Sequence, residues 1–414
     1  MTFDIFDLSL EIRKSLEKNN YKTPTKIQEE VIPLVKTKKD IIAQAKTGSG
    51  KTASFVIPIL ESLKAKKVSK KAKIKVLVLA PTRELTLQIA DTFSNFSEFF
   101  SQKPSIVSII GGEKIGEQLL KIQKGCDIVV ATSGRLLDII GRNQIDLSNL
   151  EFFVLDEADK MLDLGFVKEL DEVLNSIPEK RQNLMFSATY PQKVLDIVSK
   201  ISQNPIEVKI ETASTKVDEI TQRAILVKKE DRNPLLLQLI KKNKFKSVLV
   251  FVSTKRAAEN ISNKFRKKGY NAESFHGDLS QEERVFTLED FKNKDIQILF
   301  STDIASRGLH IDDIDCVINF DLPRSTEDYI HRIGRTARAG KKGVAISFLD
   351  NENIEHFKLI EKRYKLNIEK ERIEGFDFTL LENIKQKGKA PIKGKRKSKK
   401  DKLREQNLNN KPNE

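Results

Sequence analysis

A glycine-rich segment near the N-terminus has the residue types and the spacing that bind phosphate groups. The apolar run DIIAQ leads into AKTGSGKT at residues 45–52, and the apolar segment ASFVIPIL follows. Between a strand and a helix, the N–H groups of such a loop face phosphate oxygens. Lys51 would neutralise the β- and γ-phosphates, and the Thr52 hydroxyl would reach Mg²⁺. Ala45 stands where the usual motif has its first glycine, and a purely structural glycine turn is the competing interpretation.

A group of carboxylates follows a second apolar run. Residues 152–155, FFVL, end in Asp156-Glu157-Ala158-Asp159. Carboxylates at the C-terminal end of a parallel strand face the crevice in which α/β proteins bind their ligands. Asp156 is therefore expected to hold Mg²⁺, and Glu157 to orient or deprotonate an attacking water. An acidic turn that caps the next helix is the alternative if these four residues are considered alone.

Both loops need a parallel sheet to position them, and the chain has the matching pattern. Short β-branched runs recur, each followed by a segment of helical length, which predicts parallel strands with helices on both faces. The length of 414 residues exceeds what one core usually supports, so two domains are expected. The predicted strands lie at residues 40–45, 76–80, 127–131, 152–156 and 183–187, and then at 247–253, 296–302, 316–320 and 343–349.

Composition suggests where the domains end. Residues 204–217 contain Pro205 and a polar stretch without periodicity, which indicates a linker. We assign residues 1–208 to a first domain, 209–218 to the linker and 219–374 to a second domain. Residues 375–414 are predicted to be a disordered basic tail. Between Lys385 and Arg404 the tail has eleven Lys or Arg residues and one acid, which is two thirds of the formal net charge of +15.

Several classes of protein are disfavoured by the sequence. Cys126 and Cys316 are far apart and have no CxxC spacing, so we expect buried thiols rather than a disulfide or a zinc site. The N-terminus lacks the apolar core of a signal peptide. No run of about 20 apolar residues occurs, so we expect no membrane span and a cytoplasmic location.

The ordered set of motifs resembles the DEAD-box family of superfamily 2 RNA helicases. The resemblance is carried by AKTGSGKT, PTREL at 81–85, DEAD at 156–159, SAT at 187–189 and HRIGRTARAG at 331–340. The N-terminal segment and the compact core with a basic tail are most similar to the bacterial RhlE-like branch. The resemblance implies an α/β fold of two tandem RecA-like domains, each a mostly parallel sheet flanked by helices, which close around ATP and single-stranded RNA.

The resemblance adds residues to the ATP site. Gln28 would pair with the adenine edge, and Phe3 would stack on the ring. Arg335 and Arg338 match the arginine fingers that the second domain supplies to the γ-phosphate, although a plain surface cluster is the alternative. The catalytic residues implied are Lys51, Glu157, Arg335 and Arg338, and the metal ligands are Thr52 and Asp156. The nucleotide-binding residues implied are Phe3, Gln28, Ala45, Lys46, Thr47, Gly48, Ser49, Gly50, Lys51, Thr52, Asp303, Arg335 and Arg338.

A second group of matched residues concerns RNA. His331 and the segment Ser187, Ala188 and Thr189 match residues that couple hydrolysis to RNA release or unwinding. Glycines, hydroxyls and helix N-termini present donors to a phosphodiester backbone, so contacts independent of base sequence are expected. The RNA-binding residues implied are Pro81, Thr82, Arg83, Gly111, Gly112, Thr132, Ser133, Gly134, Arg135, Thr254, Gln281, Arg284, Thr302, Arg307 and Gly308.

Five positions depart from the usual family pattern. Ser133 replaces a proline, Ser301 and Ser306 replace alanines, His310 replaces a frequent aspartate, and Ala337 replaces a glycine. None of these exchanges removes a charge from the ATP site, so we expect activity to survive.

The function predicted from the sequence is RNA-stimulated ATP hydrolysis coupled to local, non-processive unwinding or remodelling of RNA duplexes and ribonucleoproteins, in ribosome assembly or RNA turnover. ATP and Mg²⁺ are the expected cofactors, and we expect a monomer. An ATP-gated RNA clamp with little unwinding is the main alternative, and a DNA translocase is a third. The basic tail is interpreted as a nonspecific RNA tether rather than a solubility segment.

Overall fold

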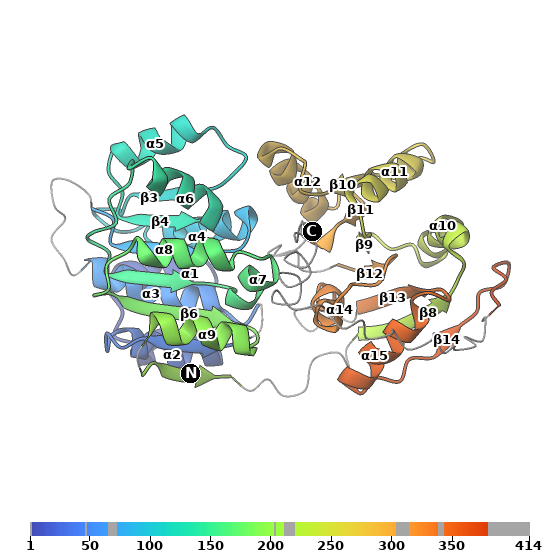
Figure 1. The fold of residues 1–414 in the computed structure, drawn as a ribbon, viewed down its shortest axis with the longest axis horizontal. Helices are drawn as coiled ribbons and strands as arrows, with labels where there is room; N and C mark the ends of the chain where they lie inside the picture. The colour runs from blue at the N-terminus through green and yellow to red at the C-terminus, as the bar shows by residue number, and fades with distance from the viewer. Residues whose placement is uncertain are drawn as a thin grey trace, which may run out of the picture. The chain divides into compact units, whose positions relative to one another are not determined.

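Two seven-stranded parallel sheets carry the fold, each flanked by helices (Figure 1). The computed structural model describes residues 2–45, 48–64, 73–202, 204–210, 220–303, 314–337 and 343–379. The chain divides into two units, Met1–Asp377 and Phe378–Glu414. All helices and strands described below belong to the first unit.

The first sheet has the strand order β3-β4-β2-β5-β6-β1-β7. The apolar runs of β2, β4 and β5 are buried along their whole length, as expected for central strands covered on both faces. All neighbouring strands in this sheet run parallel. The strands are β1 Ile41–Gln44, β2 Val76–Leu79, β3 Ile106–Ile109, β4 Ile128–Ala131, β5 Phe152–Leu155, β6 Gln182–Ser187 and β7 Ile206–Lys209.

Helices cover both faces of this sheet, with one apolar cluster on each face. In Figure 1, α8 and α9 lie in front of the first sheet. The helices of one face are α1 Leu10–Lys18, α2 Lys26–Val35, α3 Lys51–Lys64 and α4 Arg83–Phe96. The other helices are α5 Ile115–Gln123, α6 Ser133–Gly141, α7 Ala158–Asp163, α8 Val167–Asn175 and α9 Gln192–Ile201.

The second sheet repeats the topology of the first, with the order β10-β11-β9-β12-β13-β8-β14. Each strand of this sheet therefore has a counterpart at the same place in the first. The strands are β8 Ile220–Leu226, β9 Val248–Phe251, β10 Ala272–Phe275, β11 Ile298–Ser301, β12 Cys316–Asn319, β13 Gly343–Leu349 and β14 Lys370–Glu371. The described helices are α10 Arg232–Asn243, α11 Lys255–Arg266, α12 Gln281–Asn293, α14 Thr326–Ile333 and α15 Ile354–Tyr364.

The two α/β domains and all nine predicted strands are confirmed, but the sequence analysis missed five strands. Strand β3 alternates buried and half-buried residues, and β10 has polar residues in its middle, so neither forms a continuous apolar run. Strands β7, β8 and β14 were also missed. The interpretation of residues 204–217 as linker was wrong for β7, which pairs with β1, because Pro205 and the charged side chains hid a strand at the edge of the sheet.

The second domain continues past Glu374, where the sequence analysis ended it. Ile373 and Phe376 pack against its apolar cluster, so the first residues assigned to the tail belong to the folded part. The other domain boundaries stay predictions. Residues 380–414, which carry the basic run, lie outside the described residues.

Cys126 and Cys316 are buried free thiols, as predicted. Burial raises the pKa of Cys126 to about 12, so its thiol is unreactive near neutral pH. Among the described residues, no helix is long and apolar enough to cross a membrane.

Candidate active site and RNA surface

The phosphate loop lies between β1 and α3, with Lys51 as the first residue of the helix. Lys51 is buried, and its Nζ donates to the carbonyl oxygen of Ala45 over 3.0 Å. Gly48 and Gly50 have φ angles of +80° and +94°, a region that glycine adopts at little cost. The Lys51 side chain is therefore held toward the end of β1, and Gly48 and Gly50 have backbone conformations that suit a phosphate-binding loop. Lys46 and Thr47 lie outside the described residues.

Gln28 joins the segment before α2 to the phosphate loop. Its side chain is 1% exposed. Oε1 accepts the N–H of Thr25 over 3.0 Å, and Nε2 donates to the carbonyl oxygen of Gly50 over 3.1 Å. A Cβ at Gly50 would lie 2.5 Å from Gln28 Nε2, so only glycine fits there. An amide carries two N–H donors and an oxygen with two lone pairs, so Gln28 keeps capacity for adenine, and that pairing stays a prediction.

Phe3 is packed against other aromatic rings. It lies in the short 3₁₀ segment Phe3–Ile5, is 6% exposed, and contacts Phe6 and Tyr21 at centroid distances of 5.9 and 6.4 Å. This ring belongs to the apolar cluster of the first domain. Its stacking on adenine stays a prediction.

Asp156 is a buried carboxylate at the C-terminal end of β5. Its Oδ1 accepts the N–H of Glu157 over 2.8 Å. Burial raises the pKa of Asp156 to about 6, and the charge of Glu157 adds to this effect while Lys51 opposes it. A carboxylate that is costly to ionise without a cation is suited to bind one.

Glu157 is held by a residue that the sequence analysis missed. Lys160 Nζ lies 2.6 Å from Glu157 Oε1, and the two side chains are 7% and 4% exposed. Burial alone would raise the pKa of Glu157, but Lys160 and Lys51 outweigh it and lower the pKa to about 2. Glu157 Oε2 is buried and has no hydrogen-bond partner among the described residues, so an ionised oxygen remains for a water molecule.

The backbone conformation of Glu157 and the spacing of Lys160 along the chain both relate to this geometry. Glu157 has φ +51°, a left-handed conformation that is uncommon outside glycine and is often found at functional sites. Lys160 follows Glu157 by three residues, which is the spacing of neighbours on a helix. That spacing was the signal available for finding Lys160.

Hydrogen bonds tie the DEAD segment to the SAT segment. Asp159 Oδ2 accepts both the N–H and the Oγ1 hydroxyl of Thr189, each over 2.9 Å. Ser187 Oγ accepts the N–H of Asp159 over 3.2 Å and donates to the carbonyl oxygen of Thr189 over 2.7 Å. Gln44 Nε2 donates to the carbonyl oxygen of Ala188 over 3.3 Å. Direct hydrogen bonds therefore join the acidic loop to the SAT segment, and the coupling role of that segment stays a prediction.

Asp303 in the second domain binds an arginine that the sequence analysis passed over. Its two carboxylate oxygens accept from Arg332 Nε and Nη2 over 2.6 and 2.7 Å. Arg332 also donates to Asn319 Oδ1 over 2.9 Å and lies 4.7 Å from the ring centroid of Phe251. Arg332 lies in HRIGRTARAG next to His331, which was predicted as a site residue. Only the folded structure shows that Arg332 is buried and has a structural role. The ribose contact of Asp303 stays a prediction.

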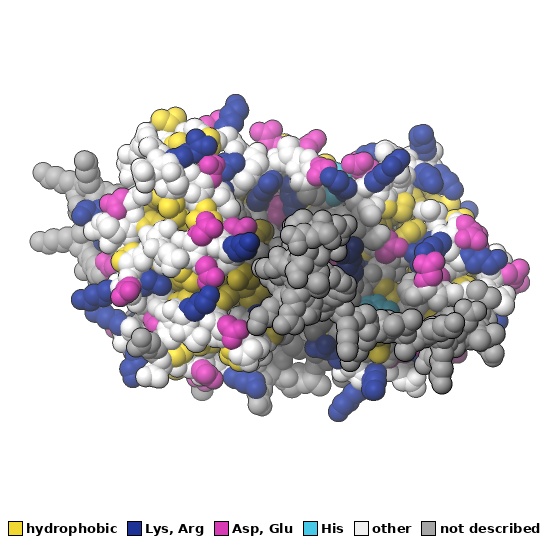
Figure 2. All heavy atoms as spheres, viewed as in Figure 1, with side chains coloured by type: hydrophobic (Ala, Val, Ile, Leu, Met, Phe, Trp, Pro, Cys, Tyr) yellow, Lys and Arg dark blue, Asp and Glu magenta, His cyan; other side chains and the backbone are white. Residues whose placement is uncertain are grey.

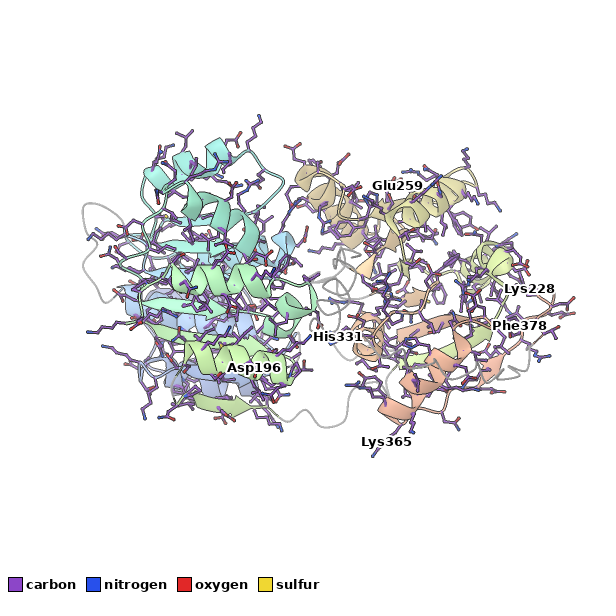
Figure 3. All side chains as sticks on the ribbon, viewed as in Figure 1. Asp196, Lys228, Glu259, His331, Lys365 and Phe378 are labelled. Carbon is purple, nitrogen blue, oxygen red and sulfur yellow. The ribbon has the colours of Figure 1, made fainter. Side chains whose placement is uncertain are left out.

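His331 and Arg335 come from α14 and the turn that follows it, and Figure 3 labels His331 on that helix. Burial lowers the pKa of His331, and Lys160 and Arg335 add to the effect while Asp159 opposes it, so the imidazole is neutral near pH 7. Arg335 is buried, and its charge is one of those that lower the pKa of Glu157. Arg338 lies outside the described residues.

Arginines and glycines converge on the predicted RNA surface of the first domain. Arg83 begins α4 behind its cap Thr82 and lies over the turn of Gly111 and Gly112. A Cβ at Gly112 would lie 2.5 Å from Arg83 Nη1. Burial lowers the pKa of Arg83, the charges of Arg284 and Arg135 lower it further, and Glu84 and Glu113 oppose them. A phosphate would relieve this repulsion between guanidinium groups.

The other first-domain candidates surround α6. Thr132 is its N-cap residue, and Arg135 Nη1 donates to the carbonyl oxygen of Glu113 over 3.0 Å. A Cβ at Gly134 would meet open space, so a backbone could approach there closely. Pro81 is buried directly before the α4 cap.

Arg284 connects the predicted RNA segments of the two domains. Its Nε lies 2.5 Å from Glu84 Oε1, and its Nη1 donates to the carbonyl oxygen of His276 over 3.0 Å. Both Glu84 and Arg284 are buried. Glu84 was missed, although it stands within PTREL next to Arg83. Because one partner precedes the other by 200 residues, only the tertiary structure pairs them.

The remaining second-domain candidates have fewer contacts. Thr254 caps α11 by accepting the N–H of Ala257 over 3.1 Å. Both amide atoms of Gln281 are buried and lack a hydrogen-bond partner among the described residues. The N–H of Thr302 donates to the carbonyl oxygen of Phe275 over 3.3 Å. Arg307 and Gly308 lie outside the described residues.

Two of the described departures from the family pattern lie at tolerant positions, and the third, Ala337, has a small conformational cost. Ser133 is the first residue of α6, a position that also suits proline. Ser301 ends β11 and donates to the carbonyl oxygen of Thr302 over 3.1 Å. Ala337 has φ +56°, which costs an alanine about 1 kcal/mol relative to glycine. Ser306 and His310 lie outside the described residues.

Comparisons with known proteins show which family the chain is similar to. The family model DEAD/DEAH box helicase matches residues 25–197, and the helicase conserved C-terminal domain matches residues 231–340. The DEAD-box ATP-dependent RNA helicase CshA of Bacillus subtilis is 35% identical over 392 residues, which are 93% of this chain and 78% of the relative. The chain belongs to the DEAD-box ATP-dependent RNA helicase family. The helicase DeaD of Buchnera aphidicola is 38% identical over 91% of this chain and 62% of its own length.

Solved structures of DEAD-box helicases share the fold. S. cerevisiae Dbp5 bound to RNA and ADP BeF3 has a TM-score of 0.77 at 31% identity, over 90% of this chain and 95% of that one. Mss116p bound to single-stranded RNA and AMP-PNP has a TM-score of 0.78 at 28% identity, over 90% and 79% of the two chains. The family and the RecA-like fold predicted from the motifs are thus confirmed. The RhlE-like branch stays a prediction.

Proposed function

We propose that this protein hydrolyses ATP when RNA is bound and uses the cycle to separate short RNA duplexes locally, without moving processively along a strand. The observation that carries the proposal is the convergence of Lys51, Asp156 and Glu157 at the C-terminal ends of β1 and β5. The charge of Lys51 acts on both carboxylates. That arrangement suits a nucleotide triphosphate and a water placed for attack on it.

Mg²⁺ fits the residues present. The Thr52 hydroxyl and the buried Asp156 carboxylate are hard oxygen donors of the kind that Mg²⁺ prefers, and the ion keeps several waters and phosphate oxygens as its other ligands. When bound, Mg²⁺ would neutralise charge on the phosphates. The high pKa of Asp156 supports this assignment, because the carboxylate has no ion pair within the described part of the chain.

The protein's own groups would divide the remaining work. Lys51 binds the phosphates, and Glu157, already ionised, orients the attacking water or accepts its proton through its unpaired Oε2. Arg335, with Arg338, would stabilise the charge that builds on the transferred phosphoryl group. Because these arginines belong to the second domain, hydrolysis would require the two domains to close, which is how RNA binding would control it.

RNA recognition would rest on the sugar and phosphate groups. The charges of Arg135 and Arg284 act on Arg83, which lies beside Gly111 and Gly112, and no base-reading side chain is needed for contacts to phosphate. The proposal therefore includes binding that is independent of base sequence. The basic tail would add a nonspecific tether whose affinity falls with salt.

An ATP-gated RNA clamp with little unwinding activity is the second candidate, because the same residues would close on RNA in both cases. Displacement of a short RNA duplex by the wild type and by Glu157→Gln, with ATP present, separates them. The helicase requires repeated displacement by the wild type and at most one round by the variant. Equal remodelling by both proteins would refute the helicase. ATP hydrolysis stimulated by DNA and not by RNA would instead establish a DNA translocase.

A further inference from the structure

An open pocket on the surface of the second domain lies away from the motif loops, at the end of the sheet where the strands begin. Its volume is about 490 Å³. We name it the strand-start pocket and define it by Lys241, Lys244, Lys246, Lys294, Phe245 and Tyr270, which line it. These residues come from the last turn of α10 and its connection to β9, from the turn before β10 and from the turn after α12.

The strand-start pocket is separate from the predicted ATP and RNA sites. Thr254, Gln281 and Thr302 all follow the C-terminal ends of β9, β10 and β11, whereas the pocket precedes those strands. Strands β9, β10 and β11 have four residues each, which corresponds to about 13 Å of sheet. One short RNA strand at the motif loops would therefore leave the pocket free.

The rim of the pocket is strongly positive. Residues 241–247 contain four lysines and no acid. The nearby residues 264–270 contain three more lysines and Arg266, which is paired with Glu273 over 2.5 Å. Figure 2 shows Lys and Arg side chains, in dark blue, over the α11 region of the second domain. The nearby Asp315 carboxylate accepts backbone N–H groups of Lys246 and Ser247 over 2.7 and 3.2 Å. Asp290 and Asp295 are the acids around Lys294.

Helix dipoles explain part of this charge. Lysines at the C-terminal end of a helix are favoured, which would account for Lys241 at the end of α10. Lys246 stands after that helix and directly before β9, so the dipole of α10 gives no reason for it. Lys244 and Lys294 have φ angles of +50° and +69°, where glycine or asparagine would cost less. A negatively charged ligand in the pocket would attract the ammonium groups of all four lysines, and this gives one common reason for their positions.

Two half-buried aromatic rings complete the pocket. Phe245 and Tyr270 pack against the apolar cluster of the second domain while lining the cavity. Tyr270 is supported by Phe265 at a centroid distance of 5.8 Å. Gln297 Nε2 donates to the carbonyl oxygen of Phe245 over 2.6 Å, which fixes that segment. Rigid aromatic rings beneath a ring of cations are typical of sites for single-stranded nucleic acid, because bases stack while phosphates meet the cations.

We propose that the strand-start pocket is a second RNA-binding site, which takes a single-stranded segment that flanks the strand held at the motif loops. This inference rests on the proposed function, because it assumes RNA as the substrate. An acidic peptide would satisfy the lysines but would leave the aromatic rings without a stacking partner, so RNA is favoured. The pocket would anchor the protein beside a duplex while the motif loops act on it.

The test compares two full-length triple variants with the wild type. The pocket variant combines Lys241→Gln, Lys244→Asn and Lys246→Gln, with asparagine chosen because it tolerates the left-handed conformation. The control variant combines Lys103→Gln, Lys121→Gln and Lys124→Gln, three exposed lysines of the first domain. Affinity is measured for a short RNA that fills only the motif loops and for the same RNA with a single-stranded extension, over a range of salt concentrations.

We expect the pocket variant to bind the extended RNA about tenfold more weakly than the control variant. The slope of log affinity against log salt concentration should correspond to the release of about two fewer counterions. Its affinity for the short RNA and its ATPase activity with the short RNA should match the control. Ultraviolet crosslinking of the extended RNA should label Tyr270. Equal binding of the extended RNA by both variants would overturn the second site. So would equal losses for both RNAs, because the lysines would then act on the motif loops.

Two further outcomes identify other failures. If the pocket variant loses binding of a poly-glutamate peptide but keeps its affinity for the extended RNA, the pocket is a protein-docking site and the RNA proposal is wrong. If the wild type binds neither RNA and RNA does not stimulate its ATPase activity, the proposed function itself has failed. The wild-type measurements therefore distinguish the two failures.

Discussion

The two domains have the same strand order, yet the charged residues at one equivalent position form ion pairs in only one of them. Lys51 begins α3 after β1, and Arg232 begins α10 after β8, the counterpart of β1. Asp156 follows β5, and Asp321 lies two residues beyond β12, the counterpart of β5. Each domain thus places a cation at a helix start and a carboxylate near the end of a strand that lies at the same place in its sheet.

In the second domain these charges satisfy one another. Arg232 Nη1 donates to Asp321 Oδ1 over 2.6 Å, and Nη2 donates to Asp350 Oδ2 over 2.5 Å. The guanidinium carbon lies 5.7 Å from the ring centroid of Phe320. The position is filled by the protein's own side chains, so it cannot receive a phosphate.

In the first domain the charges are left for a ligand. Lys51 donates to a backbone carbonyl, Asp156 accepts from a backbone N–H, and neither forms an ion pair within the described residues. Buried charges without ion partners cost folding free energy. The comparison teaches that one topological position becomes structural when its charges are paired internally, and stays open to a ligand when they are not.

Removing Arg232 should produce the largest effect on this comparison. Arg232→Met leaves Asp321 and Asp350 without their cation, which should lower the free energy of unfolding by about 3–5 kcal/mol. Chemical denaturation measures this change. The triple variant Arg232→Met, Asp321→Asn, Asp350→Asn should recover most of the loss, because no uncompensated charge remains. Unchanged stability of the single variant would show that the pair is not structural.

Removing Lys51 should lower the rate of ATP hydrolysis rather than the stability of the fold. Lys51→Ala should lower ATP hydrolysis by a factor on the order of 10²–10³, because a preorganised cation at the phosphates is lost. The unfolding free energy should change less than in Arg232→Met, because Lys51 forms no ion pair in the described part of the chain and acts on Asp156 and Glu157 only through its charge. When the two variants are measured together, Arg232→Met should mainly lose stability, and Lys51→Ala should mainly lose ATP hydrolysis. Wild-type turnover in Lys51→Ala would contradict the site assignment.

A smaller effect concerns the pKa of Asp156. Because its folded-state pKa of about 6 lies above the ordinary value of 3.8, the ionised carboxylate destabilises the folded protein. The penalty is complete above pH 6 and shrinks as the pH falls toward 3.8. Asp156→Asn should therefore raise the stability at neutral pH, without Mg²⁺ or nucleotide, by about 1–3 kcal/mol. The gain should shrink toward about pH 5.

The matched control for that variant is Asp321→Asn in the second domain. Because Asp321 is paired with Arg232, its neutralisation should lower stability at neutral pH rather than raise it. Thermal unfolding of both variants between about pH 5 and 8 gives the comparison. If both substitutions shift stability in the same direction, the contrast between the two positions is wrong.

Local patterns in the sequence predicted much of this molecule. The apolar runs of β2, β4, β5, β9 and β12 are continuous because central parallel strands are buried on both faces. The motifs around Lys51 and Asp156 are contiguous, so their residue types predict phosphate and metal chemistry without a fold, whereas the role of HRIGRTARAG was implied by the family resemblance. The edge strands β3, β7, β10 and β14 were missed because half-exposed strands mix polar and apolar residues.

The pairing of distant charges was decided only by the tertiary structure. Arg232 meets Asp321 and Asp350, Arg284 meets Glu84, and Asp303 meets Arg332. No local pattern marks such partners, because ion pairs form where strand order and helix packing bring side chains together, whatever their separation along the chain. The sequence by itself determined the two α/β domains and the identity of the phosphate loop. Only the folded chain decided which buried charges are paired and which remain for a ligand, because that depends on burial and contact, which no spacing encodes.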